Sequence, residues 1–163
     1  MGSKGIRDQV AIVGMGCTPF GEHWDKSADD LLIDAATETF QSAGVERDAV
    51  DAYWLGTMGS GASGMALSEP LKIQYKPVTH VENFCATGSE ALRNACYAVA
   101  SGAYDLAMAI GVEKLKDSGF SGLVVSGMAD DGTASTMTAP AMFSLLAPAY
   151  CKKYGLDEET LKD

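Results

Sequence analysis

Residues 77–112 read PVTHVENFCATGSEALRNACYAVASGAYDLAMAIGV, and this stretch decides the fold. Pro77–Asn83 predicts a strand, with proline at the first position, where no hydrogen-bond donor of a sheet is lost. Ala86–Ser101 carries an apolar stripe at helical spacing and predicts a helix that Gly102 ends. Asp105–Val112 is apolar along almost its whole length and predicts a buried strand. A strand, a helix and a strand in this order favour a parallel pair with a right-handed crossover.

The residues before this stretch continue the alternation of strands and helices. Val10–Gly16 is apolar or glycine throughout, which predicts a first strand covered on both faces. Ser27 forms the pattern of a capping box with Asp30 and predicts a helix start, and Gly44 predicts the end of that helix. Ala52–Gly56 predicts a second buried strand. We therefore expect an α/β protein with a mostly parallel sheet and right-handed crossovers.

The C-terminal part of the sequence has a different character. Residues 114–139 are rich in Gly, Ser, Thr and Met and show weak periodicity. Ala141–Tyr154 predicts a helix that Pro148 disturbs and Gly155 closes. Asp157 has the features of the N-cap of another helix, of which the sequence holds barely one turn. Because a single capped turn is unstable alone, we expect the natural polypeptide to continue past the last residue.

Composition and charge argue against several classes of function. The chain has 163 residues and a formal net charge of -10, and a surface this acidic repels nucleic acid. No stretch approaches the ~20 apolar residues that span a bilayer, and the N-terminus lacks the apolar segment of a signal peptide. We therefore expect a cytoplasmic protein that binds neither nucleic acid nor membranes. The 4 cysteines form no C-x-x-C pair and there are 2 histidines, so we expect free thiols and no metal site.

Cys85 lies between a predicted strand and the start of a predicted helix. The first backbone N–H groups of a helix have no intrahelical partner and carry partial positive charge. A thiolate at such a position is stabilised and therefore more nucleophilic. The same amides can donate hydrogen bonds to an oxyanion when an acyl carbonyl is attacked. The spacing alone leaves a second interpretation open, in which Cys85 is a small buried hydrophobic residue.

The residues around Cys85, Val81-Glu82-Asn83-Phe84-Cys85-Ala86-Thr87-Gly88-Ser89-Glu90-Ala91-Leu92, resemble the nucleophile motif of thiolases, especially the sterol-carrier-protein-2-like group. Val10–Gly21 resembles the first strand and turn of that group, and Ala103–Lys114 resembles the strand after its nucleophile helix. Gly132–Gly155 is similar to the start of its substrate-covering loop domain. The resemblance implies the N-terminal half of a thiolase-like fold, with layered α-β-α architecture and the start of a loop or cap domain.

The same resemblance implies a division of the chain and a chemistry. Residues 1–113 are expected to form the α/β core, and residues 114–163 the truncated beginning of the lid domain. Cys85 is expected to take an acyl group from acetyl-CoA or a 3-oxoacyl-CoA and pass it on through a covalent S-acyl intermediate. Coenzyme A thioesters are the implied substrates, no permanently bound cofactor is expected, and no residue is assigned to coenzyme A binding.

The acid–base partners of the cysteine are expected outside this sequence. In thiolases a histidine deprotonates the thiol, and a second cysteine or histidine acts on the other carbon. The family motifs that carry these groups lie in its C-terminal half and do not occur here. His23 resembles a loop residue, and His80 lies in a predicted strand whose alternation can turn it to the opposite face. We therefore expect the chain alone to be incomplete and to show little or no turnover.

Other candidate side chains have simpler interpretations. Cys96 follows Cys85 by three helical turns, roughly 16 Å, so it is expected to pack in the core rather than exchange protons with it. Cys17 is expected to be structural, and Cys151 is unassigned. Three methionines, which lie where the family's loop domain covers the acyl chain, are either pocket-lining or packing residues: Met128, Met137 and Met142. Three loop glycines lack the context of a dinucleotide-binding motif: Gly59, Gly61 and Gly64.

Two alternatives to a thiolase stay open at this point. A decarboxylating condensing enzyme of the ketosynthase kind shares the fold and the cysteine. A non-catalytic partner subunit that kept half of the fold is the other alternative. Half a fold leaves apolar surface exposed, so the resemblance implies a homodimer or dimer of dimers, a remaining C-terminal half, or a small accessory subunit of oligonucleotide-binding-like fold.

Overall fold

The computed structural model describes residues 5–115 and 139–157. These residues belong to two compact units, which lie within Met1–Ser118 and Gly119–Asp163. The boundary between residues 113 and 114 that the sequence suggests stays a prediction. In the described part of the chain, no helix is long and apolar enough to cross a membrane.

The first unit is built on a parallel sheet of three strands in the order β2-β1-β3. β1 spans Ala52–Gly56, β2 spans Val78–Val81 and β3 spans Ala107–Gly111, each within a stretch predicted as a strand. Gly56 at the end of β1 is in register with Val81 and with Gly111. All three strands therefore end at one edge of the sheet, and the loops that follow them meet there.

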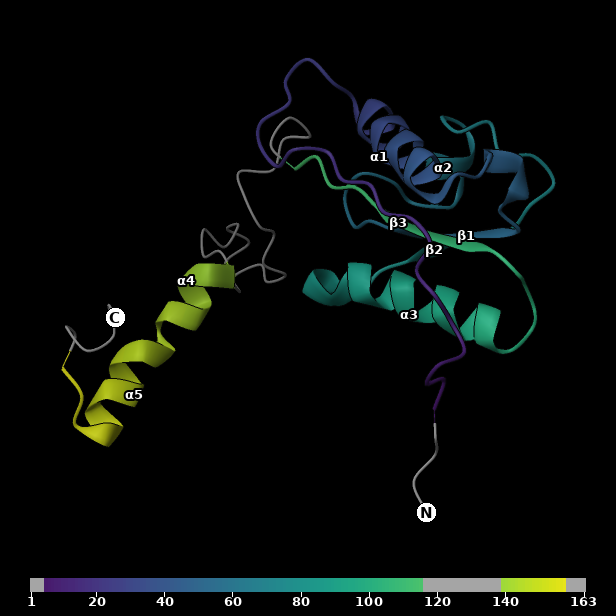
Figure 1. Ribbon diagram of the computed structural model, residues 1–163. Coiled ribbons are helices and arrows are strands. Elements are labelled where there is room, and N and C mark those ends of the chain that lie inside the picture. The colour runs from purple at the N-terminus through teal and green to yellow at the C-terminus, as the bar shows by residue number, and fades with distance from the viewer. Residues whose placement is uncertain (1–4, 116–138, 158–163) are drawn as a thin grey trace. The chain divides into compact units, whose positions relative to one another are not determined.

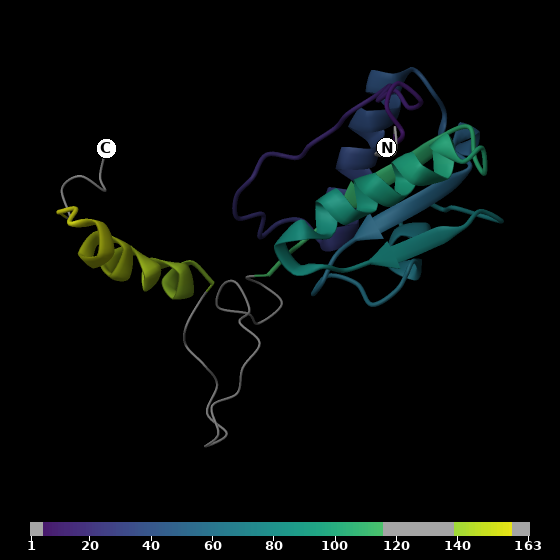
Figure 2. The same ribbon diagram turned by 90° about the horizontal axis from the view of Figure 1, so that it is seen from below.

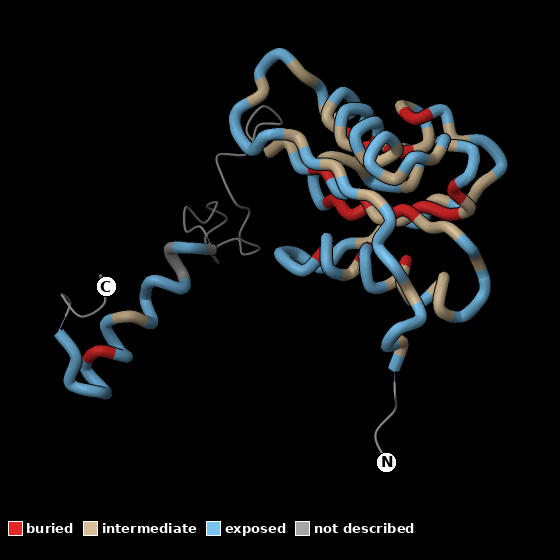
Figure 3. The backbone as a smooth tube through the Cα atoms, viewed as in Figure 1, coloured by how far each residue is buried: buried red, intermediate tan, exposed pale blue. Residues whose placement is uncertain are grey.

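Helices cover both faces of this sheet. α1 (Ala28–Ala43) and α2 (Met65–Ser68) lie on one face, and α3 (Thr87–Ala100) lies along the other (Figures 1 and 2). The predicted α/β fold with α-β-α layers is confirmed. The buried residues run along the strands and the inner sides of the helices, as Figure 3 shows. Leu32 and Ala36 of α1 and Leu55 of β1 have no exposed surface, so the sheet and α1 share one core.

Local sequence signals fix the ends of α1. The backbone N–H of Asp30 donates to Ser27 Oγ over 3.1 Å, and the backbone N–H of Ser27 donates to Asp30 Oδ2 over 2.8 Å. Gly44 follows the helix with φ of 67°, a left-handed conformation that glycine adopts without steric cost. Both predicted ends of the helix are confirmed. Two short 3₁₀ turns complete the unit: η1 (Arg47–Ala49) before β1 and η2 (Phe84–Ala86) before α3.

The prediction of a first strand at Val10–Gly16 is wrong. This segment forms no sheet ladder, and the backbone N–H of Met15 donates to Ser42 Oγ of α1 over 3.2 Å. It lies against α1 so closely that a Cβ on Gly16 would be 2.4 Å from the carbonyl oxygen of Ala35. The segment thus makes a hydrogen bond to a helix side chain in place of the ladder of a strand.

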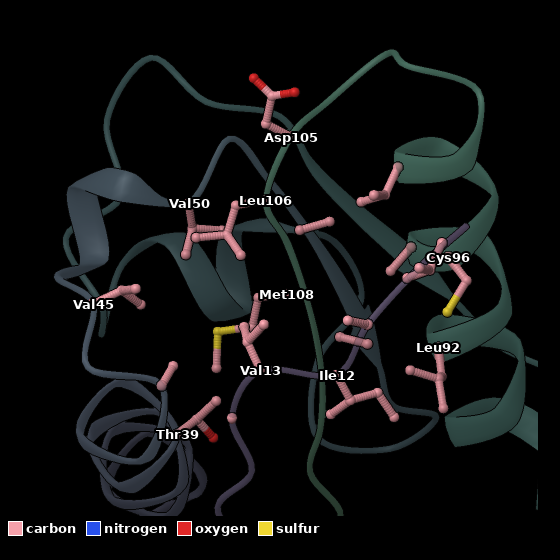
Figure 4. A pocket seen from close by; sticks show the side chains of 18 of the residues that line it. Ile12, Val13, Thr39, Val45, Val50, Leu92, Cys96, Asp105, Leu106 and Met108 are labelled. Carbon is pink, nitrogen blue, oxygen red and sulfur yellow. The ribbon is translucent and has the colours of Figure 1, made fainter. Parts of the chain in front are cut away.

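Residues of this segment, of α1, of α3 and of β3 line a cavity of about 300 Å³ (Figure 4). Its lining is mostly apolar and includes Ile12, Val13, Leu92, Cys96 and Met108. An apolar run in a sequence indicates a preference for burial, but pairing needs an adjacent strand edge within hydrogen-bond reach. Val10–Gly16 makes no such pairing, and Ile12 stays 67% exposed.

In the second unit, residues 139–157 are described, and they form the helices α4 (Ala139–Ser144) and α5 (Leu146–Tyr154). The sequence predicts one helix here, disturbed by Pro148. Because proline has no N–H to donate to the carbonyl of Ser144, four residues earlier, the break between α4 and α5 has a direct cause. Gly155 ends α5 with φ of 65°, as predicted. The helix expected after Asp157 lies outside the described residues.

Candidate functional site

Three loops meet at the carboxyl edge of the sheet, and one of them carries Cys85. They follow the ends of β1, β2 and β3 and comprise Thr57–Ser60, Glu82–Ala86 and Val112–Glu113. The backbone N–H of Val112 donates to the carbonyl of Gly56 over 3.2 Å, which continues the pairing of β1 and β3 past the strand ends. In open parallel sheets, this edge is where ligands bind.

Cys85 is exposed and lies in the 3₁₀ turn η2, directly before α3. The predicted helix start is thus confirmed to within one residue, because α3 begins at Thr87. Ala86 precedes the first residue of α3 and has no side chain that could cap the amides of the first turn. The amide of Thr87 donates to the carbonyl of Phe84, whereas no side chain caps the amides that follow it, so those can donate to an anion beside the cysteine.

A carboxylate holds this turn from the end of β2. The hydroxyl of Thr87 donates to Glu82 Oε2 over 2.7 Å, and the backbone N–H of Phe84 donates to Glu82 Oε1. Thr87 Oγ1 also accepts the backbone N–H of Asn83 over 2.7 Å. The hydrogen bond from Thr87, followed by those from the backbone amides, lowers the pKa of the Glu82 carboxyl from its ordinary value. The carboxylate therefore binds the residues on both sides of Cys85.

The backbone directly before Cys85 adopts a conformation that is uncommon for its residue type. Phe84 has φ of 49°, in the left-handed region that a residue with a bulky side chain rarely occupies. Such a conformation costs on the order of 1–3 kcal/mol and persists only where the surroundings enforce it. The hydrogen bond from the Phe84 amide to Glu82 is one contact that enforces it here.

A second carboxylate ties the ends of β3 and β1 together. Glu113 Oε1 accepts the hydroxyl of Thr57 over 3.0 Å and the backbone N–H of Gly59 over 3.1 Å, and it also accepts the amide of Met58. The hydroxyl of Ser60 donates to Glu113 Oε2 over 3.4 Å. A single side chain thus orders the whole loop after β1.

The start of α3 packs tightly on the end of β1. A Cβ on Gly56 would lie 3.0 Å from Thr87 Cγ2 and 3.4 Å from the Thr87 carbonyl oxygen. Glycine is therefore the residue that allows the strand to approach the helix this closely. Because Thr87 also contacts Glu82, the position of Cys85 depends on contacts from both β1 and β2.

Both histidines are bonded to backbone carbonyls. His80 Nε2 lies 2.7 Å from the carbonyl oxygen of Thr57, and His23 Nε2 lies 2.6 Å from that of Pro19. His23 also lines a cavity of about 240 Å³ together with Trp24 and Glu113. Each ring therefore has one nitrogen engaged with the backbone.

Within the described part of the first unit, neither Cys17 nor Cys96 forms a hydrogen bond with Cys85. All four cysteines are free thiols. Cys96 is half-buried on α3 and lines the cavity beside β3, Cys151 is buried in the second unit, and Cys17 is exposed. Met128 and Met137 lie outside the described residues, and the side chain of Met142 is not described.

Sequence reasoning missed the carboxylates and hydroxyls that hold the edge together. Glu82 and Thr87 stand within the motif around Cys85, but no role was assigned to them. Their signal is the position of an acidic residue directly after a predicted strand and of a hydroxyl residue at a helix start. Glu113, which follows the last strand, gives the same signal, because unpaired loop amides at a strand end need an acceptor.

Comparison with known proteins supports one family. The model of the thiolase N-terminal domain matches residues 10–141. An acetyl-CoA acetyltransferase of Methanocaldococcus jannaschii is 34% identical, and the alignment covers 96% of this chain and 42% of that protein. Sterol carrier protein 2 of Gallus gallus is 29% identical over 94% of this chain and 31% of its own length. The chain thus spans less than half the length of these relatives.

A solved structure agrees with this assignment at the level of the fold. The acetyl-CoA acetyltransferase from Syntrophomonas wolfei superposes with a TM-score of 0.59 at 24% identity, covering 88% of this chain and 41% of that one. The family model covers most of the chain, and it includes the turn with Cys85 and all three strands. The chain therefore belongs to the thiolase family and matches its N-terminal domain.

Proposed function

We propose that this chain carries the nucleophile of a thiolase-type acyltransferase, and that the nucleophile is Cys85. One observation carries the proposal: in a chain of this family, Cys85 is exposed in a turn directly before the uncapped start of α3. The thiolate of Cys85 and the amides of the first helical turn can act on the same carbonyl group. Attack on that carbonyl places negative charge on its oxygen, which these amides stabilise.

The proposed reaction proceeds in two acyl transfers. The Cys85 thiolate attacks the thioester carbonyl of acetyl-CoA, the S–C bond to the enzyme forms, and the C–S bond to coenzyme A breaks. Coenzyme A leaves as a thiolate and takes up a proton. A second acetyl-CoA, deprotonated at C2, then attacks the acetyl-cysteine carbonyl, and the Cys85 thiolate leaves as the carbon–carbon bond of the 3-oxoacyl-CoA forms. In the degradative direction, Cys85 attacks the 3-oxo carbon of a 3-oxoacyl-CoA, and the carbon–carbon bond breaks to release acetyl-CoA after protonation. Coenzyme A then takes the acyl group from the cysteine.

We also propose that the acid–base groups of this reaction come from outside the described residues. His23 and His80 are engaged by backbone carbonyls, so neither is assigned as the base. The 163 residues alone are expected to form the acyl-enzyme slowly and to give little or no turnover. Coenzyme A thioesters are the proposed substrates, in line with the names of the acetyl-CoA acetyltransferase relatives, and no bound cofactor is proposed.

The proposed partners are other protein surfaces of the same enzyme. Ile12, Val13 and Met15 are 67%, 57% and 73% exposed, an apolar segment that a partner surface would cover. A homodimer or dimer of dimers, a C-terminal half, or a small accessory subunit would each supply such a surface. A cytoplasmic location stays a prediction.

Competitive labelling tests the role of Cys85. The chain is treated with acetyl-CoA or iodoacetamide, and the extent of modification at each cysteine is measured by peptide mass spectrometry. Cys17, which is also exposed, is the internal control. We expect acetylation at Cys85 to be at least about tenfold faster than at Cys17. The fast acetylation should be lost in Cys85→Ser and retained at Cys85 in Cys17→Ser.

Equal rates of acetylation at Cys85 and Cys17 would contradict the proposal and favour a non-catalytic subunit. A second measurement separates the two enzyme classes in the complete protein. Cleavage of a 3-oxoacyl-CoA that depends on coenzyme A supports the thiolase. Condensation that depends on a malonyl thioester supports the ketosynthase instead.

A further inference from the structure

We infer that Glu82 is a positioning residue for Cys85: its carboxylate fixes the turn that presents the thiol between β2 and α3. The inference rests on the proposed role of Cys85 and deepens it. Glu82 follows the last residue of β2 directly, so the sheet holds its backbone. Its two carboxylate oxygens bind different residues, Phe84 before the cysteine and Thr87 after it.

The hydrogen bonds around Glu82 leave the turn few alternative conformations. Thr87 Oγ1 donates its proton to Glu82 and accepts the N–H of Asn83, each over 2.7 Å. Thr87 is buried, with 8% of its surface exposed, so water does not readily replace these partners. Rotation of the Thr87 side chain would break both bonds. The carboxylate and the hydroxyl therefore hold the ends of the turn as one unit.

The carboxylate of Glu82 stabilises an uncommon backbone conformation at Phe84. The positive φ of 49° at Phe84 turns the chain sharply just before Cys85, and the Phe84 side chain stays 65% exposed rather than packed in the core. Packing of the phenyl ring therefore contributes little to holding this backbone. The hydrogen bond from the Phe84 amide to Glu82 opposes relaxation to a negative φ, together with the backbone hydrogen bonds from Ala86 to Asn83 and from Thr87 to Phe84.

The chemistry of the proposed reaction makes such positioning matter. Acyl transfer needs the sulfur on the trajectory to a carbonyl whose oxygen reaches the helix amides at the same time. Alkylation by iodoacetamide needs only an accessible thiolate. A residue that positions Cys85 therefore affects acetylation by acetyl-CoA more than alkylation, whereas a general loss of folding affects both. Because Glu82 binds Phe84 and Thr87 on either side of Cys85, it acts on the cysteine through the turn.

Two pairs of variants of the full chain distinguish the effect of the hydrogen bonds from the effects of side-chain size and charge. Glu82→Ala removes both acceptors, whereas Glu82→Gln keeps one oxygen for the Phe84 amide. Thr87→Val removes the hydroxyl at nearly constant shape, whereas Thr87→Ser keeps the hydroxyl and removes the methyl group. Glu69→Ala, which removes an exposed carboxylate from the end of α2, is the matched control.

We expect Glu82→Ala and Thr87→Val to lower the ratio of acetylation to alkylation at Cys85 about tenfold, which corresponds to about 1.4 kcal/mol. Glu82→Gln and Thr87→Ser should keep most of that ratio, and Glu69→Ala all of it. Circular dichroism identifies a variant that fails to fold. An unchanged ratio in folded Glu82→Ala would overturn the inference.

Hydrogen exchange provides a measurement that does not depend on the reactivity of Cys85. In Glu82→Ala, the amides of Asn83 and Phe84 should exchange about tenfold faster, while the amides of β1 keep their rates. No increase at these two amides would overturn the inference even if Cys85 is the nucleophile. Conversely, equal acetylation of Cys85 and Cys17 in the unsubstituted chain would contradict the proposed function and leave the exchange result to decide whether Glu82 orders the turn.

Discussion

The contact between Gly56 and Thr87 allows a sharp test of how the sheet supports the turn with Cys85. Gly56→Ala adds a methyl group whose carbon would lie 3.0 Å from Thr87 Cγ2, closer than carbon atoms pack in protein interiors. The side chain of Thr87 cannot simply rotate away. Its hydroxyl is bonded to Asn83 and to Glu82, each over 2.7 Å, so rotation would break two hydrogen bonds.

The expected loss of stability follows from two opposing effects. Overpacking of this kind costs about 1–3 kcal/mol. Replacement of glycine by alanine in a strand returns about 0.5–1 kcal/mol, because the unfolded chain loses conformational freedom. The net effect of Gly56→Ala is therefore a decrease of about 1 kcal/mol in the free energy of unfolding. For a chain of this size, such a decrease lowers Tm by about 2–4 °C.

Thermal and urea denaturation measure this effect, and a double-mutant cycle assigns it to Thr87. Thr87→Ser removes Cγ2 and keeps the hydroxyl, so it should recover most of the loss when combined with Gly56→Ala. Gly88→Ala is the matched control, because a Cβ on Gly88 has no atom within 4 Å. That control should raise stability through helix propensity, by at most about 1 kcal/mol. Unchanged stability in Gly56→Ala would show that the contact with Thr87 is not tight. Additive effects of Gly56→Ala and Thr87→Ser would show that Thr87 is not the residue in the way.

Two further predictions concern other carboxylates of the first unit. Glu113→Ala removes the acceptor of the loop after β1 and should lower the free energy of unfolding by about 1.5–3 kcal/mol, with faster hydrogen exchange at Met58 and Gly59; equal exchange at these amides would contradict the assigned role. Asp51 accepts the amides of Leu106 and Asp105, which lower its pKa from the ordinary value of 3.8. Its contribution to stability is present above pH 3.8 and disappears as the pH falls through the lower folded pKa. Asp51→Asn should therefore flatten the acid limb of a plot of urea midpoint against pH, and an unaltered slope below pH 4 would argue against it.

The sequence was informative wherever one local signal decides the outcome. The capping box of Ser27 with Asp30 and the glycine at 44 fixed both ends of α1, because these contacts lie within a few residues of each other. The apolar run of β1 gave its bounds without error. The same kind of run at Val10–Gly16 gave a wrong prediction of a strand. Strand formation depends on pairing with the edge of a sheet, and residues far away in the sequence contribute that edge.

The candidate site also has features that the local sequence predicts and features that it does not. The placement of Cys85 between a strand and a helix start could be predicted, because the motif around it is contiguous and the periodicity changes on either side. The position of Glu113 after a predicted strand signals an acceptor for loop amides, but its partners could not be predicted, because they precede it by more than 50 residues. No pattern along the chain indicates which strand ends become neighbours.

The sequence by itself determined the α/β class, the family and the cysteine at the start of α3, because these depend on local periodicity and on one contiguous motif. Only the tertiary structure decided the order β2-β1-β3, which brings the three loops to one edge. It also decided that Glu82 and Thr87 hold the turn and that Gly56 supports it. The physical reason is that hydrogen bonds and van der Waals contacts act over a few ångströms in space, whatever the separation of the residues along the chain.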